Sequence, residues 1–139
     1  MIKLNNPYAK LEGYNCFGCA PENEEGLKLT FYEDGEEIVT EWQPTKQYEG
    51  FYQVLHGGIQ ATLMDEIANW VVVVKTNTSG MTIEMTTQYH KPVMIEDGHP
   101  VTIRARLTEK NRKKAHIHAQ IFNFAGDLCS ESKVVYYLF

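Results

Sequence analysis

The feature that most constrains this chain is a long apolar stretch, residues 55–74, which includes two adjacent glycines near its start and then continues without glycine or proline. Its main apolar residues recur at helical spacing and fall on one side of a helix: Ile59, Leu63, Ile67, Trp70 and Val74. Much of the remaining helix surface is apolar as well. We therefore predict a single long helix that is buried on most sides, and no other stretch indicates a helix as clearly.

A narrow polar stripe interrupts this apolar helix. Thr62, Asp65 and Asn69 share it, because residues three and four apart lie on the same side of a helix. A buried carboxylate without a partner is costly. Asp65 therefore faces a solvent gap, is capped by a neighbouring amide, or takes part in chemistry, and the spacing leaves these alternatives open.

The start of the helix, His56-Gly57-Gly58, leaves its first backbone amides unobstructed by side chains. These amides lack intrahelical acceptors and carry the positive end of the helix dipole. They are suited to hold a carbonyl oxygen as it becomes an oxyanion. An ordinary glycine-rich entry turn explains the same pattern.

Two motifs carry a resemblance to a known family. His56-Gly57-Gly58 followed by residues 62–66, Thr-Leu-Met-Asp-Glu, resembles the acyl-CoA thioesterases of the hotdog fold, in the phenylacetic-acid-degradation (PaaI-type) branch. Residues 16–27, which begin Cys-Phe-Gly-Cys, are similar to the short N-terminal signature of one subgroup. The resemblance covers nearly the whole chain and implies one hotdog thioesterase domain, residues 1–139.

The order of the predicted elements agrees with that implication. Alternating or β-rich runs predict two strands before the helix and four after it, at residues 27–32, 37–42, 81–89, 101–107, 115–121 and 128–139. In residues 81–89, strict alternation places Met81, Ile83, Met85 and Tyr89 on one face. We predict an α+β hotdog fold, an antiparallel sheet wrapped around one long central helix, with an edge strand free to pair with a second copy.

Composition narrows the class of protein. At 139 residues and 43% hydrophobic content, the chain suits one globular domain. The formal net charge of −5 gives no electrostatic footprint for nucleic acid. No stretch is typical of a signal peptide or a membrane span, so we expect a cytoplasmic protein with no membrane partner.

Thioester hydrolysis needs a group that activates water or attacks the carbonyl, and donors for the oxyanion. Asp65 is the candidate general base or nucleophile, and the Gly57 amide is the candidate oxyanion donor. Eight residues of helix separate them by about 12 Å, too far for both to contact one carbonyl group. The site therefore pairs Gly57 of one chain with Asp65 of another, which predicts a homodimer or a dimer of dimers. The resemblance implies the same cross-subunit site for an acyl-CoA substrate.

Three further residues are expected to support the site, Thr82 and His56 by the resemblance and Asn69 by its position one helical turn beyond Asp65. The Thr82 hydroxyl matches a family position that helps to place the attacking water. Asn69 is expected to orient the Asp65 carboxylate, with a structural amide as the alternative. His56 is expected to hold the glycine turn by hydrogen bonds, because the family's histidine is chiefly structural. Several relatives carry Asn or Gln six residues before this histidine, to contact the thioester carbonyl, whereas this chain has Gly50.

Substrate binding is predicted at both ends of an acyl-CoA molecule. Gly58 shares the helix start, and three aromatic residues of the preceding loop either line an acyl pocket or cover the helix end: Tyr48, Phe51 and Tyr52. Four basic residues are candidates for the CoA phosphates, because the fold that the resemblance implies can place the basic hairpin near the pocket mouth. A solvated hairpin tip is the alternative. The four are Lys91, Arg112, Lys113 and Lys114.

Cys16 and Cys19 form half of a zinc-binding pattern, and no finger-like spacing completes it. We therefore expect a tight turn with small thiols, no metal, and no cofactor other than coenzyme A as part of the substrate. An odd number of cysteines, three, argues against a disulfide framework. The alternatives to a thioesterase are a non-catalytic hotdog protein that binds an acyl or aromatic CoA ligand, a hotdog hydratase or dehydratase, and a redox or zinc protein.

Overall fold

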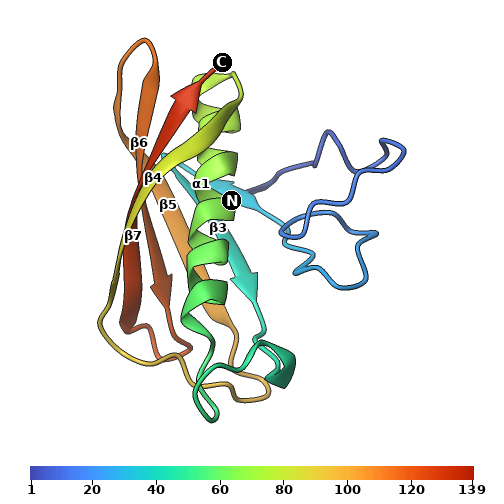
Figure 1. Cartoon of the computed structure of the whole chain (residues 1–139), viewed down its shortest axis with the longest axis vertical. Helices are drawn as coiled ribbons and strands as arrows, with labels where there is room; N and C mark the ends of the chain where they lie inside the picture. The colour runs from blue at the N-terminus through green and yellow to red at the C-terminus, as the bar shows by residue number, and fades with distance from the viewer.

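Helix α1 (Gly57–Thr76) lies against one face of a single antiparallel sheet in the computed structural model, which describes all 139 residues (Figure 1). The sheet has seven strands in the order β1-β2-β3-β5-β6-β7-β4. Their bounds are β1 (Ile2–Lys3), β2 (Tyr32–Asp34), β3 (Glu37–Trp42), β4 (Gly80–Tyr89), β5 (Val101–Lys110), β6 (Lys114–Phe122) and β7 (Leu128–Leu138). A short 3-10 helix, η1 (Lys46–Tyr48), precedes α1. The predicted architecture, an antiparallel sheet around one long helix, is confirmed.

The helix has the predicted position and two defined ends. At its start the His56 ring accepts a hydrogen bond from the Gly58 amide, which satisfies one of the amides that a helix start leaves open. At its end Asn77 adopts a left-handed conformation with φ 59°, a common helix terminator. Lys75 in the last turn bonds to Glu33 at 2.6 Å, so the helix end is tied to β2.

The core forms between α1 and the inner face of the sheet. Leu63, Ile67 and Val71 of the helix are fully buried, as are Ile103 of β5 and Ile117 of β6. Burying a side chain of this size contributes about 1.5–3 kcal/mol, so this contact supplies a large part of the fold's stability. No helix in the structure is both long and apolar enough to cross a membrane.

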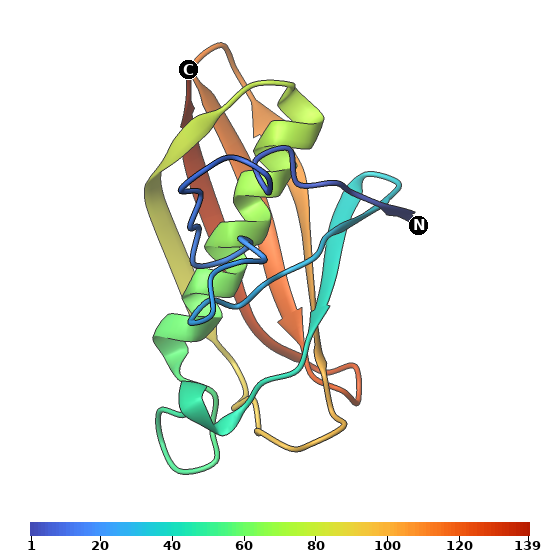
Figure 2. The same ribbon diagram turned by 90° about the vertical axis from the view of Figure 1, so that its right-hand side faces the viewer.

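A third layer covers α1 on the side away from the sheet. Residues 5–30 cross in front of the helix in Figure 2, and Phe31 at the end of this segment stacks on Trp70 with ring centres 4.8 Å apart. The predicted strand at residues 27–32 is wrong, because only Tyr32 belongs to a strand there. Leu27 and Leu29 alternate in burial but bond to the backbone of Phe17 and Gly18 instead of to the sheet.

The predicted face of β4 is also wrong in part. A β-bulge between Thr82 and Glu84 shifts the register of β4 against β7. As a result, Thr82 and Met85 both face inward: Thr82 bonds to Asp65 of the helix, and Met85 packs against the core. Strict alternation would put these two residues on opposite faces, and Met81 is left exposed.

Truncating Leu63 to alanine should lower the free energy of unfolding by about 2–5 kcal/mol, because the side chain is fully buried and leaves a cavity. Leu11→Ala is the matched control, since Leu11 is 58% exposed, and should change stability by less than about 0.5 kcal/mol. Urea unfolding at one protein concentration measures both. Equal effects would contradict the assignment of the core to the inner face of α1.

Candidate functional site

The Asp65 carboxylate is fixed through one of its two oxygens. The Thr82 hydroxyl donates to Asp65 Oδ1 at 2.6 Å, and the Tyr136 hydroxyl lies 3.1 Å from the same oxygen. Tyr136 also reaches the Asp65 carbonyl oxygen at 3.0 Å. The other carboxylate oxygen has no hydrogen-bond partner within the chain. Asp65 is half-buried, so this free oxygen belongs to an oriented carboxylate that can act on an approaching molecule.

Tyr136 is a component of this site that the sequence analysis missed. Its side chain is only 3% exposed, and burial together with the nearby Asp65 charge raises the pKa of its phenol above the ordinary value. Tyr136 therefore remains a protonated hydrogen-bond donor near neutral pH. The signal in the sequence was its position between Val134 and Leu138 on the buried face of the last strand, since a buried phenol needs a polar partner.

The start of α1 holds one free backbone donor. The Gly58 amide is occupied by His56 Nδ1 at 2.9 Å, and the Gly57 amide has no acceptor in the chain. The Tyr89 hydroxyl bonds to the Gly57 carbonyl at 2.7 Å and holds this end of the helix against β4. His56 has its Nδ1 atom engaged as a cap, which suits a structural role better than the proton transfers of a hydratase.

A hollow of about 350 Å³ opens beside this helix start. Its wall includes Phe51, His56, Gly57, Tyr89 and Lys91, and it does not include Asp65. Eight helical residues place Asp65 about 12 Å along the axis from Gly57. Within one chain the oriented carboxylate and the free amide are therefore too far apart to contact the same carbonyl group.

The remaining predicted residues of the helix and of the loop before it have different surroundings. Asn69 forms no hydrogen bond to Asp65 and lines a small cleft with Tyr14 and Trp70. Phe51 is 82% exposed and Tyr52 is 67% exposed. Tyr48 packs on Trp42, with ring centres 5.2 Å apart. Its backbone carbonyl accepts a hydrogen bond from the His56 amide, which supports the loop.

The predicted basic residues do not form one patch within the chain. Lys91 lies at the Gly57 end of the helix and pairs with Asp127 at 2.6 Å, which raises the pKa of Lys91. Arg112, Lys113 and Lys114 lie at the β5–β6 hairpin, at the opposite end of the molecule (Figure 1). Only a second copy of the chain can bring that hairpin near a Gly57 amide.

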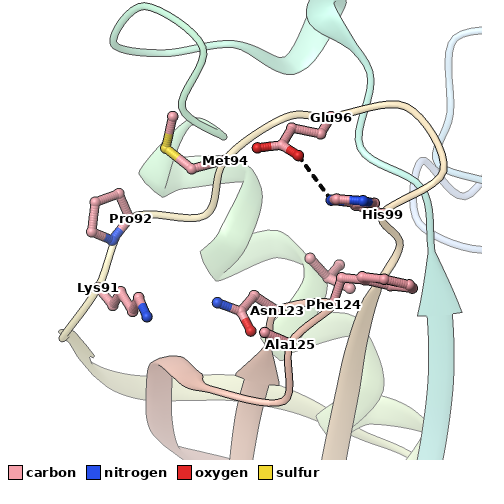
Figure 3. A pocket seen from close by; sticks show the side chains of 9 residues that line it. Lys91, Pro92, Met94, Glu96, His99, Asn123, Phe124 and Ala125 are labelled. Atoms are coloured by element: carbon pink, nitrogen blue, oxygen red, sulfur yellow. Dashed lines mark ion pairs between the residues drawn. The ribbon is translucent and has the colours of Figure 1, made fainter.

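A second hollow, of about 260 Å³, lies beyond Lys91 (Figure 3). His99 pairs with Glu96 at 2.8 Å and stacks on Phe124, with ring centres 4.5 Å apart. Neither Asp65 nor Gly57 lines it. It is therefore a neighbour of the helix-start hollow, joined to it at Lys91 and Pro92.

The glycine at position 50 has a steric reason in this chain. A Cβ atom built on Gly50 would lie 2.9 Å from the Cα atom of His56, which is closer than real contacts allow. The Gly50 amide also bonds to the Val54 carbonyl at 2.9 Å, so the loop folds tightly back toward the helix start. In this conformation the position has no room for an Asn or Gln side chain.

Comparison with known proteins identifies the class. The chain belongs to the thioesterase superfamily, because the family model of that description matches residues 52–130, more than half of its length. No curated protein gives a match.

Three solved structures illustrate the likeness of fold. The thioesterase superfamily protein RHA08564 has a TM-score of 0.79 and 22% identity over 88% of this chain, which spans only 62% of that protein. A hypothetical thioesterase from Streptococcus pneumoniae TIGR4, solved with coenzyme A, has a TM-score of 0.72 and 19% identity, and the match covers 80% of this chain and 85% of that one. The protein smu.793 from Streptococcus mutans UA159, bound to acetyl CoA, has a TM-score of 0.75 and 15% identity, with 94% and 96% covered. The pneumococcal protein has also been solved with an aspartate, and separately a threonine, replaced by alanine.

Replacing Gly50 by alanine should lower the free energy of unfolding by about 1–3 kcal/mol, because the added methyl group collides with the His56 backbone. Gly57→Ala is the matched control. A Cβ atom there meets only the Tyr89 ring at 3.5 Å, an ordinary contact, so the stability should change by less than about 1 kcal/mol. Thermal and urea unfolding compare the two variants, and equal stabilities would contradict the steric account of Gly50.

Proposed function

We propose that this protein is an acyl-CoA thioesterase, which hydrolyses the thioester bond to a free acid and CoA. The observation that carries the proposal is the Asp65 carboxylate, fixed by two hydroxyl groups with one oxygen free, on the same helix as an amide without an acceptor. Membership of the thioesterase superfamily supports the reaction class. The coenzyme A and acetyl CoA complexes of the two streptococcal neighbours support a CoA ester as substrate.

The proposed site forms between two subunits. Strand β4 ends the sheet with one side unpaired, and it exposes Met81 and Ile83. Antiparallel pairing of two β4 edges would continue the sheet and set the two α1 helices side by side in opposite directions. Gly57 of one chain would then approach Asp65 of the partner subunit, in a homodimer or a dimer of dimers.

In one route, Asp65 acts as general base. Its free oxygen takes a proton from a water molecule, and the hydroxide oxygen bonds to the thioester carbon. The carbonyl oxygen becomes an oxyanion and accepts a hydrogen bond from the Gly57 N–H. The carbon–sulfur bond then breaks, and the sulfur leaves with a proton returned by Asp65. Thr82 and Tyr136 hold the other carboxylate oxygen throughout, so the reacting oxygen keeps its direction.

In the other route, the same free oxygen attacks the carbonyl carbon directly. CoA thiolate leaves, a mixed anhydride with Asp65 remains, and water hydrolyses it. Both routes use the same two groups, need no metal or other cofactor, and take coenzyme A only as part of the substrate. Phe51, with Gly58 and the loop aromatics Tyr48 and Tyr52, is the proposed boundary of the acyl site.

Asp65→Asn should lower turnover of acyl-CoA by about 10²–10⁴-fold, because the amide cannot take a proton or attack. Gly57→Pro should lower it by about 10²–10³-fold, because proline removes the oxyanion donor. Proline suits this position, because the Gly57 amide has no acceptor and His56 has φ −55° and ψ 133°, a polyproline-II-like backbone that a following proline accepts. A panel of acyl-CoA esters with thiol detection measures turnover, and size-exclusion chromatography checks that both variants assemble like the wild type.

Mixing the two inactive variants tests the cross-subunit site. A mixed dimer has one pairing of an intact Gly57 with an intact Asp65, so refolding the variants together should recover about a quarter of wild-type activity. A site within one chain predicts no recovery, because every chain then carries a damaged half. Wild-type turnover by Asp65→Asn alone would end the proposal for this residue.

Replacing Lys113 and Lys114 by glutamine should raise the Michaelis constant for acyl-CoA about two- to fivefold, because both lysines are exposed and their phosphate contacts are screened by water. A thioester of the same acid that lacks the nucleotide should be unaffected. The control replaces Lys10 and Lys28, which are also exposed. Equal changes for both substrates would remove the phosphate role of the hairpin.

A further inference from the structure

The turn formed by Cys16, Phe17, Gly18 and Cys19 lies directly against helix α1, at the residue after Asp65. Cys16 Sγ is 3.4 Å from Cys19 Sγ and 3.5 Å from Glu66 Oε1. One ligand atom from each of Cys16, Cys19 and Glu66 lies within 4.8 Å of the other two. The two thiols and the carboxylate therefore converge on one point between the N-terminal segment and the helix.

Two of the three separations fit a tetrahedral zinc ion, and the third, between Cys19 Sγ and the Glu66 carboxylate, is at most 4.8 Å. Zinc–sulfur bonds of about 2.3 Å and zinc–oxygen bonds of about 2.0–2.2 Å place two sulfur ligands about 3.8 Å apart, and a sulfur and an oxygen about 3.5 Å apart. The observed 3.4 Å and 3.5 Å differ from these by a few tenths of an ångström at most. The ligand types, thiolate with carboxylate, are also ones that zinc accepts.

The backbone of the cysteine turn leaves room for the Glu66 side chain. A Cβ atom on Gly18 would lie 2.4 Å from the Glu66 side chain, so the turn admits the carboxylate only because it has glycine there. The carbonyls of Cys16, Phe17 and Gly18 bond to the amides of Ala20, Leu27 and Leu29. These backbone bonds fix the turn without using either thiol, so the two sulfur atoms form hydrogen bonds with each other, Glu66 and Tyr14 only.

Glu66 has no cationic partner in the structure. No lysine, arginine or histidine pairs with it, and its single hydrogen bond is the weak one from the Cys16 thiol. Cys19 is only 6% exposed, so the cluster is largely shielded from water. A divalent cation would neutralise the carboxylate and the thiolates together.

We propose that Cys16, Cys19 and Glu66 bind one zinc ion, which fastens the N-terminal segment to α1. Tyr14, whose hydroxyl lies 3.0 Å from Cys19 Sγ, borders the site. The fourth zinc position is left to a water molecule or to this phenol. The ion is structural and takes no part in the proposed hydrolysis. The zinc proposal is therefore tested independently of thioesterase activity.

The test is a titration of the full-length protein, freed of metal and reduced with a phosphine, with Co²⁺ as the spectroscopic probe. We expect one Co²⁺ per chain with a thiolate-to-cobalt charge-transfer band, which zinc then displaces. Glu66→Gln keeps both thiols and should weaken binding about tenfold or more. Cys16→Ser, at a half-buried position, should lose most of the charge-transfer band. Cys129→Ser is the matched cysteine control and should bind like the wild type, since Cys129 lies in β7, outside the cluster.

A second measurement follows the thermal midpoint. Zinc in excess should raise Tm by about 5 °C or more in the wild type and in Cys129→Ser, and should not raise it in Cys16→Ser. Absence of the charge-transfer band in the reduced wild type overturns the proposal. It is equally overturned by an unchanged affinity in Glu66→Gln, or by loss of the band in Cys129→Ser.

Discussion

The burial of α1 from two sides is the constraint on which the rest of the structure depends. The sheet covers one side of the helix, where helix residues such as Ile67 are fully buried, and the N-terminal segment covers the opposite side, where Phe31 stacks on Trp70. A polar side chain on such a helix is stable only where it remains exposed to solvent, or where one of the two layers supplies hydrogen bonds to it. Asp65 meets both conditions, since Thr82 and Tyr136 satisfy one of its oxygens and the other is free. The apolar packing thus determines where on the molecule a reactive carboxylate can be.

The parts of the fold that the sequence predicted are those with local signals. The period of the apolar residues located α1 within two residues, and alternation located β3 and the strands after the helix. The failures arise from contacts that no local pattern carries. Leu27, Leu29 and Phe31 alternate because they are buried in the core, although the Leu27 and Leu29 amides bond to the preceding turn and not to a neighbouring strand. The bulge in β4 turns Thr82 inward against simple alternation.

The candidate site divides in the same way. Asp65 and Gly57 lie on one helix and are predicted from its pattern together with the family resemblance, whereas Tyr136 is 71 residues from its partner and Glu66 is 50 residues from Cys16. Tyr136 meets Asp65 because the sheet places β7 beside α1. Cys16 meets Glu66 because the N-terminal segment crosses the helix (Figure 2). A search limited to spacing motifs therefore recovers the groups that share an element and misses those that meet across elements. The steric role of Gly50, which depends on a loop that returns to His56, is a further case.

Asp65 and Glu66 are consecutive, and about 100° of helix rotation between them points them at different layers. Asp65 bonds to Thr82 of β4 and Tyr136 of β7, and Glu66 contacts the turn of the N-terminal segment. The helix is thus held at one level by the sheet on one side and by the cysteine turn on another. A rotation of α1 that relaxed either contact would strain the other, because both residues move with the same backbone. The N-terminal segment, although it contributes no group to the proposed hydrolysis, consequently helps to fix the direction in which the Asp65 carboxylate points.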